Sequence, residues 1–309
     1  MLTWETWTGP WAGLPVAWTD DDRFDEATYR EDVARCCNAG IPGVYTGGTT
    51  GEFYAMEFDE FQAVARATVE ECRRRGTPVM IGVSSTYTRG ALRRAEFAAE
   101  LGADAIQVAL PFWMPVGEQQ IVPFFRDVAS AGAGLALSVY ETTRAKRSLT
   151  LDQHRTLHEA VPQYLMVKAN AGTPGATPEG CAALSKFVNV FVGENRWGEL
   201  GPRGARGSCS SMVYWNPRVI LDVWSKVAQQ DWQAVAEWSR RICALHEFLV
   251  NEYGPQGLTD TAYDRLGGLA SGFLKTSLRS REPYPSVTDS NVIALRDWYR
   301  SHFPEMLQI

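Results

Sequence analysis

The first 230 residues alternate between short apolar runs and longer amphipathic stretches. Eight short runs are mostly apolar, and most of them are rich in Val, Ile, Leu and Ala, which is typical of strands buried on both faces of a parallel sheet. We expect these strands at residues 14–19, 43–46, 78–83, 105–110, 135–140, 164–168, 188–192 and 204–209.

Amphipathic stretches with helical periodicity separate these runs. The expected helices cover residues 24–38, 57–75, 89–101, 118–131, 150–160, 178–186, 197–200 and 217–228. Gly40, Gly76 and Gly102 act as helix stop signals, and Thr150 is a candidate N-cap. Eight strand–helix units predict the α/β class and a (β/α)8 TIM barrel. A doubly wound sheet is the rival, but it usually has fewer strands and needs a Gly-rich first turn, which is absent here.

Three further helical stretches follow the eighth unit, at residues 232–250, 258–278 and 290–302. They do not alternate with strands. We therefore expect two parts: a barrel over residues 1–230 and a C-terminal helical extension over residues 231–309, packed on the barrel.

Composition narrows the classes of partner. The net charge of −6 and the absence of a basic run argue against nucleic acid. No apolar run is long enough to span a bilayer, and the first residues do not resemble a secretory signal, so we expect no membrane partner and a cytoplasmic location. The six cysteines form no CxxC pair, which indicates free thiols, and no His/Cys/Asp cluster suggests a metal site.

Catalytic groups of such a barrel lie at the carboxyl ends of its strands. Lys168 ends the sixth expected strand and is one of only five lysines among 30 basic residues. An apolar surround would lower its pKa, and a neutral amine attacks a ketone to form an imine. The alternative is a lysine that extends past the strand end into solvent.

Two other strand ends carry candidate chemistry. The second strand leads into the segment 47–52, whose glycines, hydroxyls and N–H groups suit a carboxylate or a phosphate, or form an ordinary Gly-rich turn. Tyr140 ends the fifth strand, where its phenol would serve as a general acid–base or simply pack.

Taken in order, Gly48-Thr49-Thr50-Gly51-Glu52, Tyr140 and Lys168 resemble the dihydrodipicolinate synthase / N-acetylneuraminate lyase superfamily of class I aldolases. The spacing from Tyr140 to Lys168 (168 − 140 = 28) fits as well. The resemblance implies that Lys168 forms the Schiff base and that Tyr140 is the acid–base. It implies no cofactor beyond this covalent imine.

The same resemblance assigns further residues to the site. Thr49 and Thr50, with Gly48, would hold the substrate carboxylate, and Thr49 would also touch the Tyr140 hydroxyl. Gly204 and Ser208, on the eighth strand, would line the imine pocket. A homo-tetramer built from dimers is expected by resemblance.

Departures from the synthase pattern shape the expected reaction. Ala145 stands where that branch has an arginine, although Arg144 and Arg147 lie close by. Phe112 and Trp113 replace a tyrosine pair. The Gly-rich segment is closer to the sugar-acid branch.

The leading hypothesis is thus a lyase for a pyruvate-like 2-oxo acid, a 2-keto-3-deoxy sugar acid dehydratase or aldolase. One alternative is a dihydrodipicolinate synthase that uses Arg144 or Arg147. Another is a catalytically weak 2-oxo-acid-binding barrel. The polar and aromatic segment 194–199 would bind substrate hydroxyls or a distal carboxylate, or it would be a solvated loop.

Overall fold

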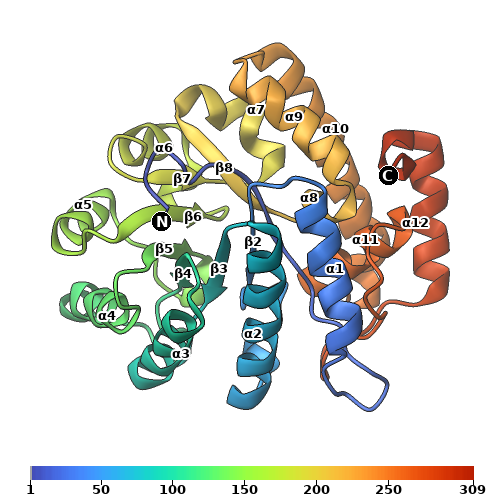
Figure 1. Ribbon diagram of the computed structural model, residues 1–309. Helices are drawn as coiled ribbons and strands as arrows, with labels where there is room; N and C mark the ends of the chain where they lie inside the picture. The colour runs from blue at the N-terminus through green and yellow to red at the C-terminus, as the bar shows by residue number, and fades with distance from the viewer. Residues whose placement is uncertain (1) are drawn as a thin grey trace. The chain divides into compact units, whose positions relative to one another are not determined.

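A computed structural model describes residues 2–309, apart from the side chain of Ser210. Its eight parallel strands form a closed barrel in sequence order (Figure 1). The strands are β1 (Gly9–Gly13), β2 (Gly43–Thr46), β3 (Val79–Gly82), β4 (Ala105–Val108), β5 (Ala136–Glu141), β6 (Tyr164–Ala169), β7 (Asn189–Phe191) and β8 (Ala205–Ser210). The predicted (β/α)8 fold is confirmed.

Helices follow the strands and continue beyond the barrel. They are α1 (Glu26–Asn38), α2 (Phe58–Arg75), α3 (Thr88–Leu101), α4 (Glu118–Ala131), α5 (Leu151–Ala160), α6 (Pro178–Leu184), α7 (Trp197–Leu200), α8 (Met212–Trp215), α9 (Pro217–Ala228), α10 (Trp232–Tyr253), α11 (Asp260–Ser271) and α12 (Asp289–His302). Gly76 and Gly102 end their helices in the left-handed conformation, and Thr150 caps α5 through a capping box, as predicted.

The position of the first strand was predicted wrongly. The apolar run at residues 14–19 is buried but is not a strand, and β1 lies just before it, at Gly9–Gly13. Pro15 interrupts the run and has no N–H to donate to a strand ladder. Burial alone therefore made the run look like a strand. In β1 the Trp11 ring covers Gly43 of β2 so closely that a Cβ there would lie 2.5 Å from it.

The chain forms two compact units. One contains the segment ending at Gly9 together with Pro78–Cys209, and the other contains Pro10–Thr77 with Ser210–Ile309. The helices of the C-terminal extension thus group with β2, α1 and α2. In Figure 1, α1 lies beside α2, α3 beside α4, and α11 beside α12. The boundary near residue 230 stays a prediction. No helix within residues 2–309 is both long and apolar enough to cross a membrane.

Asp32 of α1 makes the stability of the fold depend on pH. Burial raises the pKa of this carboxyl group to about 7, although it accepts hydrogen bonds from the backbone of the Lys275 segment. Because the pKa is near 3.8 in an unfolded chain, the folded state holds this proton more tightly. The protonated Asp32 carboxyl group stabilises the folded state fully at pH values below 3.8, and this stabilisation is lost as the pH rises to about 7.

We therefore expect Asp32→Asn to gain stability relative to the wild type as the pH rises from 4 to 7, by at least about 1 kcal/mol. Urea unfolding at a series of pH values measures this difference. A constant difference between the two proteins across that range would contradict the role assigned to Asp32.

Candidate active site

Lys168 and Tyr140 lie side by side at the carboxyl ends of β6 and β5. The two residues are paired in the register of these strands. The Lys168 Nζ atom is 4.3 Å from the centroid of the Tyr140 ring. Tyr140 is buried and Lys168 is half-buried, so the amine sits in a mostly protein-lined environment. These two predicted site residues are brought together.

Asn170 joins this pair and was missed in the sequence. It follows the end of β6, and its Nδ2 atom donates to the Tyr140 Oη atom at 3.3 Å. Since residues two apart on a strand point the same way, its spacing from Lys168 was the signal that could have found it. The amide orients the Tyr140 hydroxyl.

Gln107, Ser138 and Cys209 form a polar cluster, and Cys209 lies close enough to Lys168 to be affected by its charge. Gln107 Nε2 donates to Ser138 Oγ at 3.1 Å and lies 4.0 Å from Cys209 Sγ. Burial raises the pKa of the Cys209 thiol to about 11, and the nearby Lys168 charge opposes this rise. The Cys209 thiol therefore stays protonated at neutral pH and is an uncharged neighbour of the Lys168 amine.

The two candidates on the eighth strand need correction. Gly204 lies before β8, at its amino end, in a left-handed turn against Ser185, and so is at the wrong end of the strand for the site. Ser208 is fully buried within β8, but Cys209 is the residue that faces Gln107. Neighbouring strand residues point to opposite faces, so Ser208 faces away. The strand was identified correctly, but the wrong residue on it was chosen.

The segment 47–54 after β2 contains the other predicted residues, Gly48, Thr49 and Thr50. Gly47 has a φ of 74°, and a Cβ on Gly48 would lie 2.7 Å from the Tyr45 ring. The backbone therefore needs glycine at both positions. Among the described residues, the N–H groups of Thr50 and Gly51 make no hydrogen bond, so they are available to an anion.

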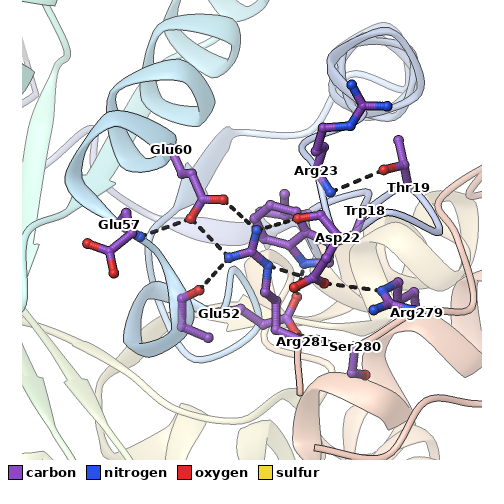
Figure 2. Close-up of polar contacts among 12 residues, drawn as sticks. Trp18, Thr19, Asp22, Arg23, Glu52, Glu57, Glu60, Arg279, Ser280 and Arg281 are labelled. Atoms are coloured by element: carbon purple, nitrogen blue, oxygen red, sulfur yellow. Dashed lines mark hydrogen bonds and ion pairs between the residues drawn. The ribbon is translucent and has the colours of Figure 1, made fainter. Parts of the chain in front are cut away.

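Glu52 anchors this segment. Its carboxylate is fully buried and accepts from Trp18 Nε1 at 2.6 Å and from the Arg281 N–H at 2.8 Å. Arg265, also fully buried, forms an ion pair with it. Figure 2 shows the outer part of the cluster, where the Arg281 guanidinium binds Glu60 and Asp22. A network of ion pairs and hydrogen bonds around Glu52 thus fixes the end of the Gly-rich segment.

A polar pocket of about 400 Å³ opens at the carboxyl ends of β5, β6 and β7. Small apolar residues such as Ala169 and Val192 share its lining with hydroxyl, amide and guanidinium groups: Thr142, Thr143, Arg144, Asn170, Asn195 and Arg196. Such groups bind hydroxyls or a carboxylate rather than an apolar chain.

The segment 194–199, which contributes to this pocket, is not a solvated loop. Glu194 and Trp197 are buried, and the Trp197 indole donates to the Gly207 carbonyl at 3.2 Å. Arg196 pairs with Glu199. The packing of Glu194 and Trp197 therefore fixes the segment whose Asn195 and Arg196 side chains line the pocket. Residues 2–309 contain no group of His, Cys, Asp and Glu side chains arranged to hold a metal ion.

Comparison with known proteins identifies the family. The dihydrodipicolinate synthetase family matches residues 9–296. The 4-hydroxy-tetrahydrodipicolinate synthase of Methanopyrus kandleri is 34% identical over 250 residues, which cover 78% of this chain and 81% of that protein. The synthase of Natronomonas pharaonis is 29% identical over 181 residues, so the match spans 58% of this chain and 60% of that relative.

A solved structure shares the fold. Proteus mirabilis N-acetylneuraminate lyase superposes with a TM-score of 0.82 at 19% identity, over 96% of this chain and 98% of that one. Enzymes of the matched family are lyases that join a lysine to pyruvate as a Schiff base and need no metal or other cofactor. The curated relatives carry the synthase name, and none of them specifically supports the sugar-acid branch. The chain belongs to the dihydrodipicolinate synthetase family of Schiff-base-forming, aldolase-type enzymes.

Proposed function

We propose that this protein is a lyase for a 2-keto-3-deoxy sugar acid, either a dehydratase or an aldolase. The observation that carries the proposal is the pocket lined by Asn170, the residue that donates to the Tyr140 hydroxyl, because the hydroxyl, amide and guanidinium groups of this pocket suit a hydroxylated substrate chain.

The chemistry starts at Lys168. Its amine adds to the C2 ketone and water leaves, giving a protonated imine that withdraws electrons from C3. In dehydration, a C3 proton is removed and the C4 hydroxyl leaves as water. In aldol cleavage, the C4 hydroxyl loses its proton, the C3–C4 electrons pass to C3, and an aldehyde departs. The enamine left by cleavage takes up a proton at C3 to become an imine again, and in either route hydrolysis of the imine by water frees Lys168.

Tyr140 would move the proton in either route. Its hydroxyl accepts a hydrogen bond from Asn170, and its ring lies against the Lys168 amine. By resemblance, the segment containing Gly48, Thr49 and Thr50 would bind the substrate carboxylate, and its backbone N–H groups suit an anion.

The second candidate is a dihydrodipicolinate synthase that condenses pyruvate with aspartate semialdehyde. Two observations favour it: the curated relatives carry the synthase name, and Arg144 lines the polar pocket. A guanidinium there would bind a second carboxylate. Against it stands Ala145, where the synthase branch has its arginine.

A substrate screen separates these functions. The protein is incubated with 2-keto-3-deoxy sugar acids of several chain lengths and, separately, with pyruvate and aspartate semialdehyde. Release of pyruvate indicates an aldolase, and loss of water detected by mass spectrometry indicates a dehydratase. Efficient condensation with aspartate semialdehyde, without turnover of any sugar acid, would overturn the proposal in favour of the synthase.

Replacing Tyr140 by phenylalanine should slow turnover by about 10²–10⁴-fold, because the proton donor and acceptor is lost while the lysine remains. The exchange of pyruvate methyl protons for solvent deuterium, followed by NMR, measures this loss without knowledge of the full substrate. Imine formation with pyruvate should persist in the variant. Unchanged exchange would remove Tyr140 from the mechanism.

We also propose a homo-tetramer, as the resemblance implies, since members of the family are typically oligomeric. The described cysteines, Cys36, Cys37, Cys72, Cys181, Cys209 and Cys243, are all free thiols, which supports a cytoplasmic location.

A further inference from the structure

Helix α11 holds the Gly-rich segment with three polar side chains of one face. Thr261, Asp264 and Arg265 are three and four residues apart and so point the same way. Thr261 Oγ1 donates to the Thr49 carbonyl at 3.2 Å, and Arg265 pairs with Glu52. The C-terminal extension therefore touches the segment that would bind the substrate carboxylate.

The bond between Thr50 and Asp264 has a chemical consequence. Thr50 Oγ1 lies 2.6 Å from Asp264 Oδ2. An ionised carboxylate only accepts, and a threonine hydroxyl has a single proton, so Thr50 donates that proton to Asp264. The Thr50 hydroxyl then has no proton left to give to a substrate carboxylate.

The surroundings of Asp264 strengthen this arrangement. Tyr214 is fully buried, and burial together with the Asp264 charge raises the pKa of its phenol well above the ordinary value. It therefore remains protonated beside Thr50 and Asp264. The Trp215 indole donates to the Asp264 carbonyl at 2.8 Å, which fixes the backbone of α11 at this point. The Asp264 carboxylate is therefore a hydrogen-bond acceptor fixed in position by its neighbours.

We propose that Asp264 is a positioning residue for substrate binding. By taking the Thr50 hydroxyl proton it locks the Gly-rich segment, so that the substrate carboxylate is bound by backbone N–H groups of the segment and not by the Thr50 hydroxyl. This inference rests on the proposed function, with pyruvate bound as an imine on Lys168. The geometry of the carboxylate-binding segment would then depend on a contact with α11, although Asp264 lies 214 residues from Thr50 in the sequence.

The test compares pyruvate saturation among matched variants. Pyruvate is trapped on Lys168 with borohydride over a range of pyruvate concentrations, and the half-saturating concentration and saturated rate are determined. Asp264→Ala should raise the half-saturating concentration by about tenfold or more, because a hydrogen bond to a charged group is lost. The saturated rate should change much less. Asp264→Asn keeps an acceptor and should restore most of the affinity.

Thr50→Val removes the other partner of the same hydrogen bond. It provides a second test if Asp264→Ala does not fold. It should weaken pyruvate binding as Asp264→Ala does, and the double variant should be no worse than either single variant, since both remove one bond. Thr50→Ser keeps the hydroxyl donor and should retain more of the pyruvate affinity than Thr50→Val. Asp260→Ala removes an exposed charge from the same helix and serves as the matched control.

The opposite model, in which the Thr50 hydroxyl binds the substrate itself, predicts the reverse for Asp264→Ala: the freed hydroxyl would keep or improve pyruvate affinity. That result, or additive effects in the double variant, would overturn the inference alone. A wild-type protein in which Lys168 is not trapped at any pyruvate concentration would overturn the proposed function, and this inference with it.

Discussion

Arg265→Met is expected to destabilise the protein by about 3–5 kcal/mol, because it leaves a buried carboxylate without its cation. Arg265 and Glu52 are both fully buried. After the substitution the Trp18 indole and the Arg281 N–H are the donors that would still hold the Glu52 carboxylate among the described residues. Urea unfolding of the two proteins at pH 7 measures the free energy of unfolding.

Two controls show whether this loss comes from the buried charge. Arg23→Ala breaks an exposed pair with Asp21 and should change stability by less than about 1 kcal/mol. Adding Glu52→Gln to Arg265→Met should recover part of the loss, because the uncompensated charge is gone. A loss for Arg265→Met as small as that of Arg23→Ala would contradict the role of Glu52 as the anchor of the Gly-rich segment.

Lys168→Ala should abolish the exchange of pyruvate methyl protons for deuterium. Exchange requires an imine that acidifies C3, and no other described lysine ends a barrel strand. The variant should therefore show only the exchange seen in buffer, a larger effect than that of Tyr140→Phe. NMR of pyruvate in deuterated buffer measures it.

Lys186→Ala is the matched control for this prediction, since Lys186 is an exposed lysine just beyond α6. It should exchange at the wild-type rate. Exchange by Lys168→Ala above the buffer rate would show that another group activates pyruvate, and the Schiff base would then have to be placed elsewhere.

The barrel was predictable because local patterns determine most of its elements. Buried parallel strands are mostly apolar, and the Gly and Thr helix signals are local, so Gly76 and Thr150 mark helix ends in the sequence itself. The first strand was the exception. There an apolar run containing Pro15 is buried without pairing, and no periodicity separates such a run from a buried strand.

The site was predictable only where its chemistry lies at strand ends. Lys168 and Tyr140 stand out because a lysine and a phenol are unusual there. Choosing Ser208 over Cys209 depended on which face of β8 points inward, and a one-residue error in alternation reverses that choice. Asp264 gave no signal, because its partner Thr50 lies on an element far away in sequence.

The most direct test of the account is to locate the pyruvate adduct. The wild-type protein is incubated with pyruvate and borohydride, digested, and mapped by peptide mass spectrometry, with Lys168→Ala as the control. The account predicts a single reduced pyruvate adduct, on Lys168, that is absent from the variant. An adduct on another lysine, or no adduct with either pyruvate or a 2-keto-3-deoxy sugar acid, would contradict it.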